Sequence, residues 1–130
     1  MIKPTLVALM MLIAAQAQPA DPVYELRTYT AIEGKLPALL ARFRDHTIQL
    51  FEKHGIESVG YWVAADPPRS ETTLYYIVKH KSREAAKASW DAFRKDPVWL
   101  KAQKESEAAG KIVDRVESVF LTSTDFSKLR

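Results

Sequence analysis

Four segments of this chain are rich in β-branched and aromatic residues, and a helical pattern follows the first and the third of them. The segments predicted as strands span residues 23–30, 57–64, 72–80 and 112–122. Between them, residues 35–53 and residues 82–109 carry apolar side chains at the spacing of amphipathic helices. The order β-α-β-β-α-(α)-β predicts an α+β, ferredoxin-like fold, in which a four-stranded antiparallel sheet carries its helices on one face.

Short sequence signals mark where the helices should begin and end. Gly55 stands where the first helix should stop, and Gly110 where the last one should. Ser82 is placed to cap the helix that follows the third strand. Asp96-Pro97 then divides that helical stretch in two, because Asp caps a helix and Pro suits its first turn.

The predicted strands are not cleanly polar on either side, which constrains how the sheet can be covered. Alternate residues of a strand point to opposite faces. The two sides read Tyr24/Leu26/Thr28 against Glu25/Arg27/Tyr29, Val59/Tyr61/Val63 against Ser58/Gly60/Trp62, and Leu74/Tyr76/Val78 against Tyr75/Ile77/Lys79. Helices cover one face only, so the other face needs a second sheet. We therefore expect a homodimer in which two sheets pack face to face as a dimeric α+β barrel.

The start of the chain has the three parts of a secretory signal peptide. Lys3 supplies a positive charge, residues 5–15 form an uncharged apolar run, and Ala15-Gln16-Ala17 fits the small-x-small cleavage pattern. The run is too short for a bilayer, which needs ~20 residues. We predict a signal peptide over residues 1–17, with Ala20 as the alternative cleavage position, and a periplasmic or secreted protein without a stable membrane anchor after cleavage. The other interpretation is an N-terminal anchor or a buried helix.

The rest of the chain reads as one domain. A short lead at residues 18–22 precedes a domain at 23–122, and a tail follows at 123–130. The 130 residues include 19 Lys and Arg against 16 Asp and Glu, and this net charge of +3 is too small to indicate a nucleic-acid partner. There is no cysteine, which excludes disulfides and thiolate chemistry. For a small exported domain without disulfides, dimerisation is an expected source of stability.

No motif of the sequence predicts a cofactor or a metal. The patterns GxSxG, GxxxxGK and GxGxxG are all absent. His46, His54 and His80 form no HxH or HxxxH pair, and a zinc site needs three or four convergent ligands. We therefore expect neither a cofactor nor a metal site.

Several short motifs occur in the order that is typical of one known family. They are Tyr24-Glu25-Leu26-Arg27-Thr28-Tyr29, Gly34-Lys35-Leu36, Lys53-His54-Gly55, Gly60-Tyr61-Trp62, Leu74-Tyr75-Tyr76, and Trp90 followed by Asp96-Pro97-Val98-Trp99. On these motifs the chain resembles the NIPSNAP family domain over roughly residues 23–121, as an exported single-domain member.

The resemblance implies a fold similar to the dimeric α+β barrels, a group that includes cofactor-free monooxygenases, isomerases and haem-binding enzymes. It implies no particular reaction, because the family has no agreed catalytic residues to carry over. The mitochondrial and vesicle-traffic roles of eukaryotic members are not expected of a single-domain chain with a secretory signal.

Histidines and a strand tyrosine are the candidates for catalysis. His46 flanks the apolar stripe of the first helix, so it is either a base that faces a pocket between helix and sheet or a hydrogen-bonded core residue. Arg42 is expected on the polar side of the same helix. His54 is expected at the end of that helix, where a cation is favoured, and His80 is expected to be exposed at the end of its strand. Tyr29 is the other catalytic candidate.

Charged residues alternate on the two strands at the ends of the domain. Glu25, Arg27 and Tyr29 share one side of the first strand, and Arg115 and Glu117 repeat the charge pattern on the last. If these strands pair, the charges could form cross-strand pairs, or line the barrel as a polar network or an anion site. The alternative is structural ion pairing at the dimer interface.

The sequence is compatible with three functions. The leading one is binding of a small hydrophobic or aromatic molecule by the homodimer, because aromatic side chains line such pockets as well as ordinary cores. The second is a cofactor-independent monooxygenase- or isomerase-like enzyme with His46 or a strand tyrosine in proton transfer. The third is a structural or partner-binding module without a pocket. The residues predicted to bind the ligand are Tyr24, Arg27, His46, Trp62 and Tyr75.

Overall fold

The computed structural model describes Ile2 and residues 21–130. Apart from Ile2, the predicted signal peptide at residues 1–17 lies outside the described residues, as does the predicted lead as far as Ala20. Within the described part of the chain, no helix is both long enough and apolar enough to cross a membrane.

The described elements follow the predicted order. The strands are β1 (Val23–Ala31), β2 (Glu57–Val63), β3 (Thr73–His80) and β4 (Val113–Leu121). The helical elements are α1 (Leu36–Arg42), a π-helical turn η1 (Phe43–Thr47), α2 (Ile48–Lys53), a 3-10 turn η2 (Arg69–Glu71), α3 (Arg83–Lys95) and α4 (Pro97–Ser106). The helix predicted over residues 35–53 is therefore one helical segment with a π turn at its middle.

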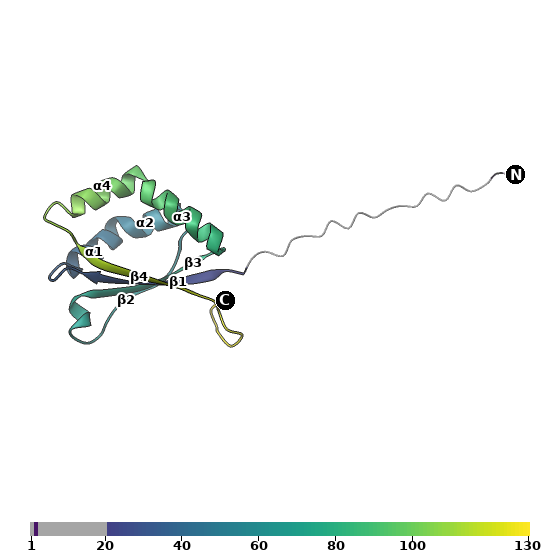
Figure 1. The fold of residues 1–130 in the computed structure, drawn as a ribbon, viewed down its shortest axis with the longest axis horizontal. Coiled ribbons are helices and arrows are strands. Elements are labelled where there is room, and N and C mark those ends of the chain that lie inside the picture. Colours follow the sequence, from purple (N-terminus) through teal and green to yellow (C-terminus); the bar gives the residue numbers. More distant parts are fainter. Residues whose placement is uncertain (1, 3–20) are drawn as a thin grey trace.

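The four strands form one antiparallel sheet in the order β2-β3-β1-β4. The helices α1 to α4 all lie on one face of this sheet (Figure 1). Connections of the same hand place successive helices on the same side of a sheet, which explains the two layers. The predicted α+β, ferredoxin-like fold is confirmed.

Both predicted helix caps are formed. Ser82 Oγ accepts a backbone hydrogen bond from α3 at 3.0 Å, and Asp96 Oδ1 accepts one from the N–H of Val98 at 2.8 Å. Asp96 Oδ2 also lies 2.8 Å from Lys53 Nζ and 2.7 Å from His54 Nε2. Hydrogen bonds from Lys53, His54 and the Val98 backbone hold the pKa of Asp96 well below its usual range. This carboxylate therefore joins the end of α2 to the start of α4.

The π turn η1 decides which residues of the first helical segment face the sheet. The N–H of Ile48 donates to the carbonyl of Phe43, five residues earlier, and Thr47 Oγ1 donates to the carbonyl of Arg42 at 3.2 Å. This wider turn puts Thr47 on the buried side and leaves His46 exposed. Arg42, predicted on the polar side of the helix, is instead only 5% exposed.

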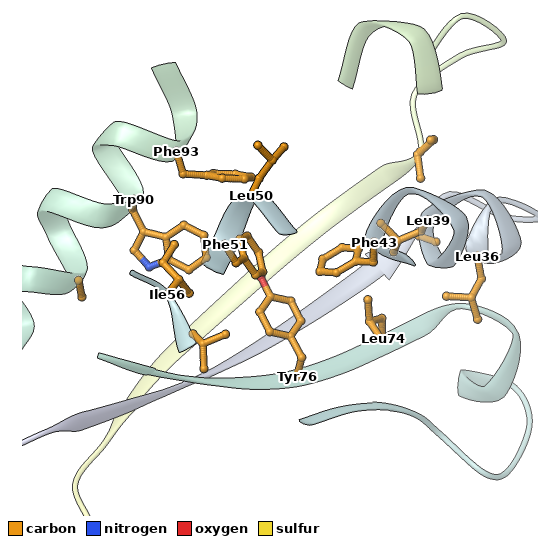
Figure 2. Close-up of a cluster of buried hydrophobic side chains, with 14 residues drawn as sticks. Leu36, Leu39, Phe43, Leu50, Phe51, Ile56, Leu74, Tyr76, Trp90 and Phe93 are labelled. Atoms are coloured by element: carbon orange, nitrogen blue, oxygen red, sulfur yellow. The ribbon is translucent and has the colours of Figure 1, made fainter. Parts of the chain in front are cut away.

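The core lies between the helices and the sheet and is built on aromatic rings (Figure 2). Tyr76, from β3, and Phe51, from α2, are fully buried, with ring centres 5.8 Å apart. Phe43 and Trp90 pack edge-on against Phe51, with ring centres at 6.0 and 5.2 Å. Because these rings come from β3, η1, α2 and α3, their packing fixes how far the helices stand from the sheet.

The opposite face of the sheet remains partly apolar and open within the described residues. It presents the side chains Leu26, Trp62, Tyr75, Ile77 and Val119. Of these, Trp62 is 51% and Val119 is 53% exposed. The tail, with residues 122–124, 127 and 129, lies over one end of this face beside Tyr24. The predicted alternation of β1 and β3 side chains between the two faces is thus confirmed.

Strand β2 departs from the predicted alternation. A bulge between Ser58 and Gly60 leaves Val59 as an extra residue. Ser58 consequently shares the helix-covered face with Tyr61, and their hydroxyl oxygens are 2.7 Å apart. On the open face Trp62 lies across Gly60, where an added Cβ would be 2.5 Å from the indole ring, so a larger residue at position 60 would displace Trp62.

Candidate functional site

A buried carboxylate on the central strand β1 accepts hydrogen bonds from three other elements. Glu25 is 1% exposed. Its Oε1 accepts from Trp90 Nε1 at 2.7 Å and from His80 Nε2 at 2.8 Å. Its Oε2 accepts from Ser118 Oγ at 2.6 Å and from Arg27 Nη1 at 2.8 Å. These five residues, which we call the Glu25 network, join β1, β3, β4 and α3.

The network keeps Glu25 charged. Burial alone would raise the pKa of this carboxyl, but hydrogen bonds from His80, Ser118, Arg27 and Trp90 together lower it to about 2. Removing a partner of a buried charge of this kind is strongly destabilising. The Glu25 network is therefore a structural centre, and its carboxylate carries no proton to donate at neutral pH.

Arg27 connects this network to two tyrosines. Its Nε donates to Tyr76 Oη at 2.8 Å and its Nη2 donates to Tyr29 Oη at 3.3 Å. Burial raises the pKa of the Tyr76 hydroxyl well above its ordinary value, and this hydroxyl donates to Tyr29 Oη at 3.1 Å. All three guanidinium nitrogens of Arg27 are thus hydrogen-bonded, and Tyr29 is held in a fixed position.

Tyr29 lies on the wall of a pocket between the helices and the β1–β4 side of the sheet, which we call the helix–sheet pocket. The pocket has a volume of about 220 Å³. Its apolar and aromatic lining is Tyr29, Phe43, Phe93, Trp99, Val113 and Val116, and its polar lining is Arg42, Thr47, Gln103, Glu107 and Lys111. The rings of Phe93 and Trp99 are 4.7 Å apart at 31°. A hollow with mostly aromatic walls and a few polar groups is typical of small-molecule sites.

A second hollow, of about 560 Å³, lies between α3 and β4 on the other side of Arg27. Arg27 and Trp90 line it together with charged residues of α3. Those charges are of both signs and partly cancel, since Lys87 Nζ is 2.9 Å from Asp91 Oδ2. The helix–sheet pocket is therefore the better candidate for a specific ligand.

The predicted ligand-binding residues do not come together. Arg27 and Tyr29 share the helix-covered face and are hydrogen-bonded to each other. Tyr24, Trp62 and Tyr75 lie on the opposite face, so the sheet itself separates them from the helix–sheet pocket. None of the five predicted ligand-binding residues lines that pocket, whereas Tyr29, a catalytic candidate, does.

Two of the three histidines are placed differently from the prediction. His46 is exposed and lines neither hollow, because the π turn rotates it out of the apolar stripe. His80, expected at the surface, is 2% exposed and bonded to Glu25. Its alternation with Tyr76 and Val78 along β3 was the signal for its burial. His54 lies at the end of α2, as predicted.

The charged side chains Arg115 and Glu117 of β4 do not contact Glu25 and Arg27 of β1. The register pairs Arg27 with Ser118, which puts Arg115 and Glu117 on the opposite face. There they are exposed and pair with each other at 3.3 Å. The predicted cross-strand ion pairs are therefore wrong, and a serine hydroxyl takes their place beside Glu25.

The comparison with protein families decides the assignment. The NIPSNAP family model matches residues 24–128, which is nearly the whole described domain. The chain belongs to the NIPSNAP family. None of the curated proteins compared with it matches.

Several solved structures share the fold of this NIPSNAP domain. A NIPSNAP family protein with unknown function from Agrobacterium tumefaciens is 23% identical, with 87% of this chain and 97% of that one covered and a TM-score of 0.72. An uncharacterized NIPSNAP domain protein from Burkholderia xenovorans is 20% identical over 81% and 97%, with a TM-score of 0.67. SnoaB, a cofactor-independent oxygenase from Streptomyces nogalater, is 15% identical over 82% and 96%, with a TM-score of 0.55. At these identities the likeness shows the fold, that of the dimeric α+β barrels, and not an activity.

The motifs on which the chain resembles the NIPSNAP family meet in space. Glu25, Arg27 and Tyr29 of the first motif contact Tyr76 and Trp90 of later ones. In the same way, the Lys53-His54-Gly55 motif meets the Asp96-Pro97 motif through the Asp96 carboxylate. Several motifs of this NIPSNAP domain therefore meet at the Glu25 and Asp96 carboxylates.

The Glu25 network predicts how the stability of the NIPSNAP domain depends on pH. Because folding lowers the pKa of Glu25 from 4.5 to about 2, its charge stabilises the fold above pH 4.5, and this stabilisation is lost as the pH falls toward 2. Glu25→Gln should lower the free energy of unfolding by roughly 3 kcal/mol at pH 7 and by about half as much at pH 3. Guanidinium chloride unfolding at the two pH values measures this.

Glu105→Gln, at an exposed position of α4, is the matched control and should change the free energy of unfolding little at either pH. An equal loss at pH 7 and pH 3 for Glu25→Gln would contradict the predicted linkage between the Glu25 charge and folding.

Proposed function

We propose that this chain binds a small, largely apolar molecule with an aromatic ring in the helix–sheet pocket. The observation that carries the proposal is the pocket wall, where Tyr29, Phe43, Phe93 and Trp99 meet around one cavity. Aromatic side chains hold a flat ligand by edge-to-face or offset contacts in addition to the burial of apolar area. A few polar groups at one end of such a pocket orient the ligand.

The volume of the pocket supports a ligand with a single ring. An apolar cavity of about 150 Å³ accepts benzene. The helix–sheet pocket, at about 220 Å³, is larger by the space of a few further atoms. One ring with a short substituent fits it better than a fused ring system or an acyl chain.

Binding is better supported than catalysis by the residues around the pocket. No histidine is among the described residues that line it, and His46 lies exposed outside it. The Tyr29 hydroxyl faces two neighbours, Arg27 and Tyr76, that already donate to it. The likeness to a cofactor-independent oxygenase is one of fold, so it does not supply the missing base.

We also propose that the protein acts as a homodimer that pairs the open faces of two sheets. The support is the apolar surface on that face, where Trp62 and Val119 are each about half exposed beside Leu26, Tyr75 and Ile77. An apolar sheet face of this kind is stabilised when another apolar surface covers it. The helix–sheet pocket lies on the other side of the sheet, so dimerisation would leave its mouth free.

The proposed place of action is outside the cytoplasm. The support is the sequence of residues 1–17, which has the charge, apolar run and cleavage pattern of a signal peptide. When the full chain is produced in a bacterium with an outer membrane, the intact mass of periplasmic protein should correspond to a chain that begins at Gln18. Protein that keeps its first residues and remains in the cytoplasm would contradict export.

Filling the pocket should weaken ligand binding. Val113→Phe places a ring in the space beside Trp99, so the affinity for benzyl alcohol, a neutral single-ring probe, should fall at least tenfold because the two rings compete for one volume. Amide chemical shifts in an NMR titration measure the affinity and show which residues respond.

Val98→Phe is the matched control, since Val98 is 54% exposed on α4 and does not line the pocket. It should bind the probe as the unchanged protein does. The proposal fails if benzyl alcohol shows no saturable binding, or if Val113→Phe leaves the affinity unchanged.

A charge on the open sheet face should dissociate the dimer. Val119→Asp buries a carboxylate between the two sheets, which is costly without a partner, so sedimentation equilibrium should show half the molecular mass of the unchanged protein. Leu100→Asp, at a position that is 50% exposed on α4, should remain dimeric. A monomeric parent protein, or a dimeric Val119→Asp variant, would refute this interface.

A further inference from the structure

Two arginines, the largely buried Arg27 and the fully buried Arg42, stand between the helices and the sheet, and they differ in their hydrogen bonds. Arg27 donates from all three of its guanidinium nitrogens. Arg42 is 5% exposed and donates only from Nη1, at 3.3 Å to Ser106 Oγ and at 3.4 Å to Glu107 Oε1. Its Nε is buried and has no acceptor among the described residues. Since buried donors are almost always paired, Arg42 is the guanidinium that lacks a strong partner.

Arg42 stands at the meeting point of the aromatic and polar walls of the helix–sheet pocket. Its guanidinium carbon is 5.3 Å from the centre of the Trp99 ring. Phe43, the next residue along the chain, lines the same pocket. A ligand ring held against Trp99 and Phe43 therefore has Arg42 within reach of its substituent.

The other charged residues of the pocket are compatible with an anionic ligand that competes with Glu107 for Arg42. Lys111, which is exposed, adds a second positive charge to the lining. Glu107 is the one acidic residue among the described lining residues, and its side chain is 32% exposed. Its contact with Arg42, at 3.4 Å, is longer than a charge-assisted hydrogen bond. The Glu107 carboxylate can therefore turn to solvent and leave its position to a carboxylate of the ligand.

We propose that the ligand of the helix–sheet pocket is an aromatic carboxylate and that Arg42 binds its carboxylate. The planar guanidinium presents parallel N–H donors that match the two oxygens of a carboxylate. Lys111 attracts the anion toward the pocket, and Glu107 competes with it for Arg42. This inference rests on the proposed function, because it takes ring binding in the same pocket as given.

Benzoate and benzyl alcohol test the inference, because they share a ring and differ in charge. Protein comprising residues 18–130 is titrated with each compound. Amide chemical shifts and calorimetry measure the binding. Benzoate should bind at least tenfold more tightly than benzyl alcohol. Equal affinities would overturn the assignment of a carboxylate ligand.

Substitutions at the polar end of the pocket then locate the effect. Arg42→Gln should remove the preference for benzoate over benzyl alcohol, whereas Arg42→Lys, which keeps the charge without the planar fork, should retain part of that preference. Glu107→Gln should raise the affinity for benzoate severalfold. Lys104→Gln, on the exposed side of α4, is the matched control and should change neither affinity.

The outcomes separate this inference from the proposed function. If benzyl alcohol binds and benzoate has no advantage, or if Arg42→Gln keeps that advantage, the carboxylate inference fails alone. If neither compound binds, the proposed function fails and the inference with it. If Arg42→Gln does not fold, the variants of Glu107 and Lys111 test the inference instead. It requires benzoate to bind more tightly to Glu107→Gln and more weakly to Lys111→Gln.

Discussion

The Glu25 carboxylate is the interaction on which the rest of the domain depends. A charge buried to this degree is tolerated only when hydrogen bonds replace the water it has lost. Glu25 receives them from Arg27, His80, Ser118 and Trp90, on three strands and one helix. These donors have to arrive together, so the carboxylate fixes the register of β3 and β4 against β1 and the placement of α3 on the sheet. The position of Arg27 follows from it, and through Arg27 the position of Tyr29.

The helix–sheet pocket is connected to the Glu25 network through Arg27 and Tyr29. Tyr29 lines the pocket on the sheet side, and the end of α1 and η1 supply Arg42, Phe43 and Thr47 from the helix side. Without the extra residue of the π turn, the helix would continue in regular register and would present a different set of side chains to Tyr29. Insertions of this kind are often found at functional sites, and here the turn places an arginine beside aromatic rings.

The sequence predicts more of the fold than of the candidate site. Strand periodicity, the caps at Ser82 and Asp96 and the order of elements gave the sheet and its helices, because these are local signals in the sequence. The pocket depends on the π turn η1, which changes the helical register by one residue and leaves no clear local signal in the sequence. The regular helical pattern therefore predicts the wrong side of the helix for both His46 and Arg42. The alternation of His80 with Tyr76 predicts its burial correctly, whereas its position at a strand end predicts exposure.

Arg27 and Arg42 differ in how completely the fold uses their hydrogen-bond donors. Arg27 belongs to a NIPSNAP motif, and its donors are used within the protein. Arg42, Glu107 and Lys111 lie outside the motifs on which the family resemblance rests, and Arg42 is incompletely paired. Among the described residues, the Arg42 guanidinium donates only to Ser106 and Glu107, so the proposed carboxylate would complete its hydrogen bonding. The proposed preference for a carboxylate therefore rests on Arg42, Glu107 and Lys111, and binding measurements on this pocket decide it.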